Sequence, residues 1–175
     1  DYILVQVRTQ TNLLIETMIQ SIDTHRVKIL KLVLLLLCIS LFIVSLFLLP
    51  FTIEGDNPKP WPIGLWCFLL GWLTVANGAG ISWLANPFLI LSWFMFHRNI
   101  KTTIWLSAFA VFFCFSFMFF HEVVTNGAGL TKKITGIGIG YYVWLSSSVI
   151  TFVSTIILLI FQSKQSFIHP HKLDS

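Results

Sequence analysis

The chain has 175 residues, of which 56% are hydrophobic and 10% are charged, and its mean hydropathy is +0.84. This composition excludes a water-soluble domain, because the polar side chains are too few to cover a surface that faces water. The net charge of +4 does not indicate a nucleic-acid partner, because the basic residues stand singly or in pairs at the ends of apolar runs, where membrane topology explains them. We therefore predict an all-α integral membrane protein with the lipid bilayer around it.

The N-terminal segment, 1–26, has the pattern of an amphipathic helix. Apolar side chains recur there at spacings of three and four residues, and polar side chains fall between them. The apolar positions are Leu14, Ile15, Met18, Ile19 and Ile22. We expect this helix to lie on the membrane surface or against a partner, or simply to lead into the first membrane span.

A four-helix transmembrane domain is predicted over 27–163, with a short polar tail over 164–175. Three of its spans are apolar runs of about 20 residues, the length that crosses a hydrocarbon core of roughly 30 Å. These spans cover 27–49, 102–124 and 139–161. The stretch that follows the first span and the one that follows the third are rich in proline or glycine, so both are predicted to be loops.

The second crossing lies in the apolar stretch 63–96. As one helix this stretch would be about 51 Å long, which exceeds the hydrocarbon core. The tetrapeptide Asn77-Gly78-Ala79-Gly80 weakens a helix, and Asn86-Pro87 is a second weak point.

Two arrangements of this stretch are compatible with the sequence. In the first, 64–76 forms a half-span or an interfacial helix and 81–96 crosses the membrane. In the second, the whole stretch is one long tilted helix that is kinked near Asn77 and Pro87. Two full crossings that turn at Asn77 are disfavoured, because they would place the basic residues after the stretch outside the cell.

The broken segment is the first candidate for a functional site, because irregular backbone inside a membrane occurs only where protein or water covers it. Its members are Asn77, Gly78, Gly80, Asn86 and Pro87. A second candidate is a face of small polar residues on the last span, which either packs against a helix or lines a path for a solute. Its members are Ser147, Thr151 and Thr155, with Ser154 beside them.

A polar pair, His121 and Glu122, is predicted at the outer interface, at the end of the third span. Such a pair could act as acid and base or as a weak metal site, although a histidine at the end of a span is more often simply interfacial. No motif of a nucleotide-binding or hydrolytic enzyme is present in the sequence, and no metal-ligand spacing is indicated. We therefore predict no catalytic activity and no cofactor.

The basic residues also predict the orientation. Eight lysine and arginine residues fall on the side of the termini and three fall on the other side. We therefore predict that both termini lie in the cytoplasm and that the protein is located in the inner (plasma) membrane. The predicted spans hold no charged residue away from their ends, which argues against a proton-coupled transporter.

Several short motifs carry family resemblances. They are Gly71-Trp72-Leu73, Trp83-Leu84-Ala85-Asn86-Pro87 and Gly140-Tyr141-Tyr142-Val143-Trp144-Leu145. These motifs resemble the pattern of small uncharacterised bacterial multi-pass inner-membrane proteins, and the resemblance implies a membrane location without a particular activity. Gly64-Leu65-Trp66-Cys67 is similar to part of the signature of claudin-like four-span proteins, but the second cysteine of that signature is missing nearby.

The leading functional prediction is a non-catalytic accessory or structural subunit that packs within a larger membrane protein complex, with other integral membrane subunits as partners. It rests on the uncharged spans and on the large contact area of the aromatic residues. The alternative is a channel or carrier for a neutral or apolar solute, with a path lined by the Asn77 break and the face of Ser147 and Thr151. An enzyme with a site at His121 and Glu122 ranks third.

Overall fold

The structure is a computed structural model that describes residues 26–55, 63–125 and 129–168. The predicted amphipathic helix, apart from Arg26, lies outside the described residues, as does the end of the predicted polar tail. The chain divides into two compact units, Asp1–Leu34 and Leu35–Ser175. The candidate site belongs to the second unit, as do all the described helices except the first part of Arg26–Leu46.

Four helices among the described residues are long and apolar enough to cross a membrane. They are Arg26–Leu46, Gly78–Met95, Ile100–Phe119 and Ile139–Phe161. The protein is therefore a mostly helical, multi-pass membrane protein, and the predicted number of long apolar helices is confirmed. The third predicted span is too long at its C-terminal end, because the helical conformation ends at Phe119 and the chain then enters a β-strand.

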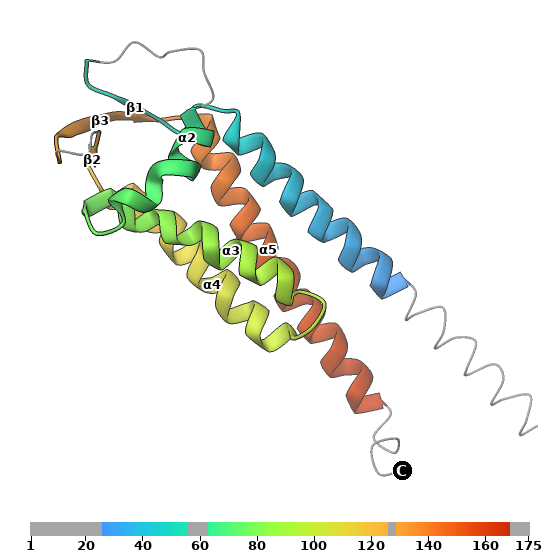
Figure 1. Ribbon diagram of the computed structural model, residues 1–175. Coiled ribbons are helices and arrows are strands. Elements are labelled where there is room, and N and C mark those ends of the chain that lie inside the picture. The colour runs from blue at the N-terminus through green and yellow to red at the C-terminus, as the bar shows by residue number, and fades with distance from the viewer. Residues whose placement is uncertain (1–25, 56–62, 126–128, 169–175) are drawn as a thin grey trace, which may run out of the picture. The chain divides into compact units, whose positions relative to one another are not determined.

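Three helices form the centre of the bundle. The helices α3 (Ala85–Met95) and α4 (Ile100–Ser116) make a hairpin, and α4 also packs against α5 (Ile139–Ile168), as Figure 1 shows. A tight turn joins α3 to α4 and ends at Asn99. The Oδ1 atom of Asn99 accepts hydrogen bonds from the backbone N–H groups two and three residues further on, which satisfies amides that a helix start leaves unpaired.

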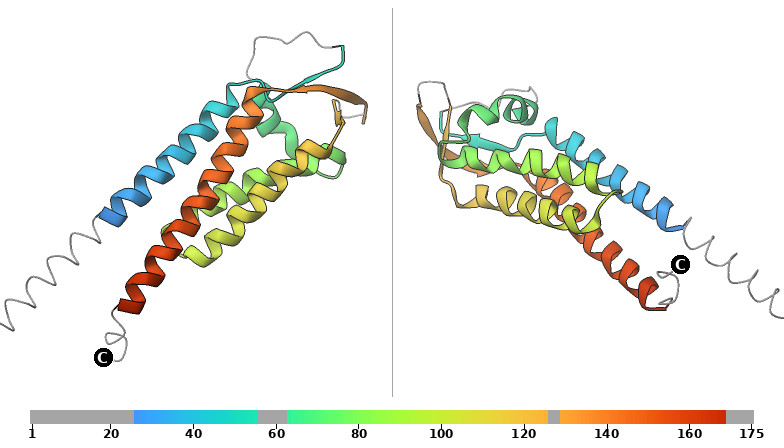
Figure 2. Two further views of the ribbon diagram at one scale, coloured as in Figure 1. Left: turned by 180° about the vertical axis from the view of Figure 1, so that it is seen from behind. Right: turned by 60° about the horizontal axis from the view of Figure 1, so that its bottom comes forward.

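The apolar stretch before α3 forms two separate helical segments. The first is α2 (Ile63–Leu70), which continues as the 3₁₀ helix η1 (Gly71–Thr74). The second is the 3₁₀ helix η2 (Gly78–Leu84), which leads directly into α3. Because η1 packs against η2, the chain turns back on itself near Asn77 (Figure 2). The structure therefore has the first of the two predicted arrangements and not one long kinked helix.

Pro87 does not kink a helix, which corrects the second arrangement. It is the third residue of α3, in the first turn, where the missing N–H of a proline costs little. A proline ring disturbs the α-helical hydrogen bonds of the preceding turn, and here the residues before α3, Gly78–Leu84, form a 3₁₀ helix. The predicted weak point is thus a change from 3₁₀ to α geometry at Ala85.

A small antiparallel sheet corrects the all-α prediction. Its strand order is β1–β3–β2, formed by β1 (Phe51–Ile53), β3 (Thr131–Ile137) and β2 (Glu122–Val124). β1 comes from the first predicted loop and pairs with β3 so that Phe51 lies opposite Ile137. Strands of three residues are too short to show the alternating pattern from which a strand is predicted. They form because β3, which is longer, pairs with both.

Two apolar clusters fill the interior of the bundle. The first comprises Phe42, Leu89 and Ala110, which come from the first helix, α3 and α4. The second lies beside the sheet and comprises Ala79, Phe117 and Tyr141. The two clusters bury side chains from every long helix, so burial of apolar surface holds the helices together within the bundle.

Candidate functional site

A cavity of about 660 Å³ lies at the sheet end of the bundle, bounded by α2, η1, η2 and the first residues of α5. This volume is within the range of roughly 300–1,000 Å³ that is typical of small-molecule sites. Its wall is mostly apolar and includes three residues of the predicted break, Asn77, Gly80 and Asn86. The break therefore contributes to the wall of a partly open cavity.

Three close contacts hold α2 and η1 against η2 beside the cavity. Nε1 of Trp83 in η2 donates a 2.7 Å hydrogen bond to the carbonyl oxygen of Phe68 in α2. Gly71 lies against the ring of Trp83, and Gly80 lies against the backbone of Thr74, so closely that a Cβ atom at either glycine would overlap these atoms. The two glycines are thus what allows the returning chain to come this near.

Asn86 is a buried polar group in the cavity wall. It is 6% exposed, and its Oδ1 atom accepts a 3.0 Å hydrogen bond from Nε1 of Trp144. An indole N–H can only donate, so the atom that receives it must be the amide oxygen and not Nδ2. Nδ2 itself has no hydrogen-bond partner among the described residues. Every fully buried side-chain nitrogen or oxygen among the described residues does have one, so Nδ2 is not fully buried, and Asn86 is one of the residues that line the cavity.

Asn77 and Gly78 form the turn at the rim. The side chain of Asn77 is exposed and makes no capping hydrogen bond to η2. Gly78 has a φ of +52°, a conformation that residues with a Cβ atom adopt only at a cost. Gly78 lies in the wall of a smaller neighbouring cavity, whereas Pro87 lines neither.

The predicted face of α5 lies inside the bundle and does not line the larger cavity. Ser147, Thr151 and Thr155 are each at most 1% exposed. The hydroxyl of Ser147 donates to the carbonyl oxygen of Cys38 in the first helix at 2.9 Å, whereas both threonine hydroxyls donate to carbonyls four residues earlier in α5. Oγ1 of Thr151 also accepts a 3.3 Å hydrogen bond from Nε1 of Trp93. All three hydroxyls therefore take part in packing.

His121 and Glu122 lie at the start of β2, where both side chains are exposed. They line the smaller cavity, of about 570 Å³, together with Asn77 and Gly78. Glu122 is opposite Lys133 in the sheet, which places unlike charges on neighbouring strands. Within the described residues, no three side chains of His, Cys, Asp or Glu lie close enough together to hold a metal ion.

Two tryptophans shape the site although the sequence prediction does not include them among the site residues. Trp83 ties η2 to α2, and Trp144 orients Asn86. Their hydrogen-bonding capacity is the feature of the sequence that could have identified them. An indole N–H inside an apolar span requires an acceptor, and Asn86 offers one because it is a polar residue in the middle of such a span.

Comparison with known proteins identifies no relative: no family model matches the chain, and no curated protein or solved structure matches it either. The resemblance drawn from the short motifs therefore stands only as a likeness to multi-pass helical membrane proteins in general. The function has to be argued from the geometry of this chain alone.

Proposed function

We propose that the chain is a non-catalytic accessory or structural subunit that packs within a larger membrane protein complex. The observation that carries this proposal is a difference between two outward-facing helix surfaces. Along α4 and the short 3₁₀ helix η3 (Phe117–Phe119) that follows it, the exposed side chains are mainly aromatic. We define this aromatic face as Trp105, Phe109, Phe112, Phe115 and Phe119, which are 47% to 71% exposed. Along the middle of α5 they are aliphatic, and we define this aliphatic face as Val149, Val153, Ile157 and Ile160.

Apolarity alone does not distinguish the two faces, because lipid chains are as apolar as either of them. Aromatic rings differ because each buries about 150–250 Å² with few rotatable bonds, and they are concentrated at the centres of protein interfaces. The spacing of three and four residues also aligns the rings along one side of the helix. We therefore assign the aromatic face to a partner, an integral membrane subunit with an apolar helix, and the aliphatic face to lipid.

The interior of the bundle supports a structural role as well. The hydroxyls of Ser147, Thr151 and Thr155 are engaged in hydrogen bonds within the bundle. The described spans carry charged residues only near their ends, so they offer no intramembrane acid or base. These features favour packing over catalysis or ion coupling.

A carrier for a neutral or apolar solute is the second candidate, and the larger cavity is the observation that favours it. The face of Ser147 and Thr151 would not contribute to its path, because these residues do not line that cavity. Such a carrier would load and release its solute past exposed residues of the cavity wall, among them Asn77 at the rim.

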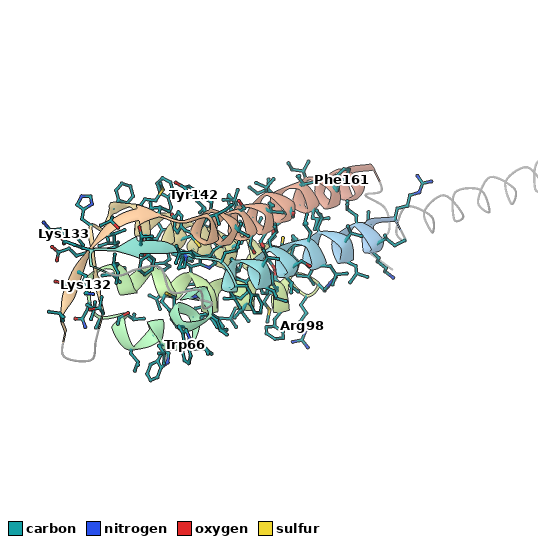
Figure 3. The ribbon with its side chains drawn as sticks, turned by 90° about the horizontal axis from the view of Figure 1, so that it is seen from above. Trp66, Arg98, Lys132, Lys133, Tyr142 and Phe161 are labelled. Atoms are coloured by element: carbon teal, nitrogen blue, oxygen red, sulfur yellow. The ribbon has the colours of Figure 1, made fainter. Side chains whose placement is uncertain are left out.

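We also propose that the protein is located in the inner (plasma) membrane. In the orientation that we propose, the sheet end faces away from the cytoplasm, and both termini lie in the cytoplasm. Figure 3 shows Lys132 and Lys133 at the sheet end and Arg98 toward the other end of the helices. The sheet carries acidic Glu54 and Glu122 nearby, whereas the turn at Arg98 is basic. A cysteine introduced at the sheet end should react with a membrane-impermeant reagent in intact cells, and a lack of reaction would reverse this orientation.

The subunit proposal is tested by photocrosslinking at matched positions. A photoreactive phenylalanine analogue replaces Phe112 in one variant and Ile157 in the control, each in the full chain in its native membrane. We expect a discrete protein adduct from position 112, because an interface ring touches its partner, and only lipid adducts from position 157. Protein adducts from both positions, or from neither, would contradict the assignment of the aromatic face.

The native particle gives an independent measurement. The 20.0 kDa chain should leave mild detergent within a much larger particle that contains other membrane subunits at fixed stoichiometry. If the particle extracted in mild detergent contains only this chain, alone or as a small homo-oligomer, the accessory proposal is contradicted and the carrier becomes the better candidate.

A further inference from the structure

No residue of the aromatic face lines the larger cavity, and the wall of this cavity points to a ligand. Aromatic and aliphatic side chains from the first helix, η3 and the start of α5 form much of that wall, among them Phe42, Leu46, Phe117 and Tyr141. Ordered water needs two to four polar partners, which such a wall offers at few points. The cavity therefore suits a guest that is mostly apolar.

One polar atom sets a requirement on that guest. Nδ2 of Asn86 has two N–H donors and no partner among the described residues, because Trp144 occupies Oδ1. A guest that covers this donor without pairing it would lose about 1–3 kcal/mol, so the guest should supply an acceptor. A neutral carbonyl fits better than an anion, because burying an unpaired charge costs far more.

The route into the cavity is apolar. Trp66, Leu70 and Leu73 line the cavity, yet each side chain is itself about half exposed. Figure 3 shows Trp66 on the outer side of α2. A guest that enters past these side chains comes from an apolar surrounding and does not have to cross water, which is the situation of a lipid chain in a bilayer.

The depth of Asn86 fits the carbonyl level of a bilayer. Its partner Trp144 lies five residues after Ile139, about 7.5 Å along α5 from the first residue of that helix. Tyr142 and Trp144 are residue types that gather at the membrane interface. Ester carbonyls of membrane lipids lie just inside that interface, whereas the acyl chains extend below it.

From these observations we propose that the cavity binds one acyl chain of a membrane lipid, whose ester carbonyl accepts a hydrogen bond from Nδ2 of Asn86. The acyl chain packs against the apolar wall of the cavity, and the ester carbonyl accepts the hydrogen bond that Nδ2 of Asn86 would otherwise lack. This site is independent of the aromatic face of α4, so either proposal can fail without the other.

The experiment compares two phosphatidylcholines with the same headgroup and chain length, one ester-linked and one ether-linked. The ether lipid lacks the carbonyl, so it tests the hydrogen bond alone. The full chain, purified in detergent, is titrated with each lipid, and bound lipid is counted by native mass spectrometry. We expect the ester lipid to bind about tenfold more tightly, which corresponds to one hydrogen bond.

Variants locate the effect. Asn86→Leu keeps a similar volume but removes the donor, so the preference for the ester lipid should disappear. Ser92→Ala is the matched control, because Ser92 is a fully buried residue of the same helix that does not line the cavity, and it should keep the preference. If Asn86→Leu fails to fold, Asn86→Ala serves instead: it also removes the Nδ2 donors but adds no bulk, so the preference for the ester lipid should again disappear.

A diazirine on the acyl chain of the ester lipid shows where it binds. Adducts are expected on η2 and on Trp66, not on Val153 or Ile157 of the aliphatic face. The proposal is overturned if wild-type protein binds both lipids equally, if Asn86→Leu retains the preference, or if the adducts lie on the aliphatic face. Equal binding would mean that water, and not a carbonyl, occupies the donor.

Discussion

Two regions of this molecule carry polar residues inside apolar segments, and they differ in whether the polar side chains have hydrogen-bond partners. On α5, Ser147, Thr151 and Thr155 lie on a regular helix and every one of their hydroxyls is hydrogen-bonded within the bundle. In the broken segment, Asn86 keeps an unpaired amide nitrogen and Asn77 makes no capping bond. We call the α5 face closed because its hydroxyls are paired and do not line the larger cavity, whereas the break borders that cavity.

The difference lies in the backbone. A regular helix presents a carbonyl four residues back, within reach of a serine or threonine hydroxyl, so small polar residues become satisfied locally. An asparagine amide has four hydrogen-bonding positions, and a helix that changes from 3₁₀ to α geometry does not satisfy all of them. Polar residues on a broken helix are therefore the ones that remain available to a ligand.

The largest expected effect on stability comes from adding a side-chain atom where η2 packs against η1. Gly80→Ala should lower the free energy of unfolding by about 2–3 kcal/mol, because the new Cβ overlaps the backbone of Thr74, which cannot easily move. The measurement is unfolding in mixed detergent micelles. Gly78→Ala is the control: its positive φ costs about 1 kcal/mol, but nothing lies within 4 Å of the added atom. Equal losses for the two variants would mean that η1 does not pack on η2 as described.

An intermediate effect is expected on the closed face. Thr151→Val keeps the volume but removes the acceptor of Trp93 Nε1, so we expect a loss of about 1 kcal/mol in the free energy of unfolding. Thr155→Val removes only a bond to the backbone of its own helix and should change stability by less than about 0.5 kcal/mol. In a Trp93→Phe background the effect of Thr151→Val should shrink, and an unchanged effect would show that the indole bond contributes nothing.

The smallest effect is expected at the rim. Asn77→Ala should change the free energy of unfolding by less than about 0.5 kcal/mol, because the side chain is exposed and makes no capping bond. Assembly into the native particle should be unaltered, which is measured by its mass in mild detergent. A loss of solute flux in a particle that still assembles would favour the carrier over the subunit.

Much of the helical architecture could be predicted from the sequence, because long apolar runs are a strong signal in a chain with few charges. The turn at Asn77 was also predictable, since glycine and asparagine weaken a helix that is too long for the bilayer. The sheet was not, because β1 is three residues long and its partner lies far away in the sequence. Local composition carries no trace of such a pairing.

The candidate site was predictable only in part. Asn77, Gly80 and Asn86 line the larger cavity, but the sequence could not distinguish them from Pro87, which lines neither cavity. The bond between Asn86 and Trp144 joins residues 58 positions apart, so no periodicity reports it. The sequence predicts His121 and Glu122 at the end of a helix, whereas Glu122 begins β2 and His121 directly precedes it.

The pairing of β1 with β3 also bears on how the chain is made. The hydroxyl of Thr52 donates to the carbonyl oxygen of Gly136, which is 84 residues later in the chain. During synthesis β1 therefore emerges long before its partner exists, and its backbone N–H and C=O groups must remain hydrated until the second and third spans have been inserted. The sheet closes only when the residues just before α5 arrive, so it can form once the third span has been inserted and before the last span has followed.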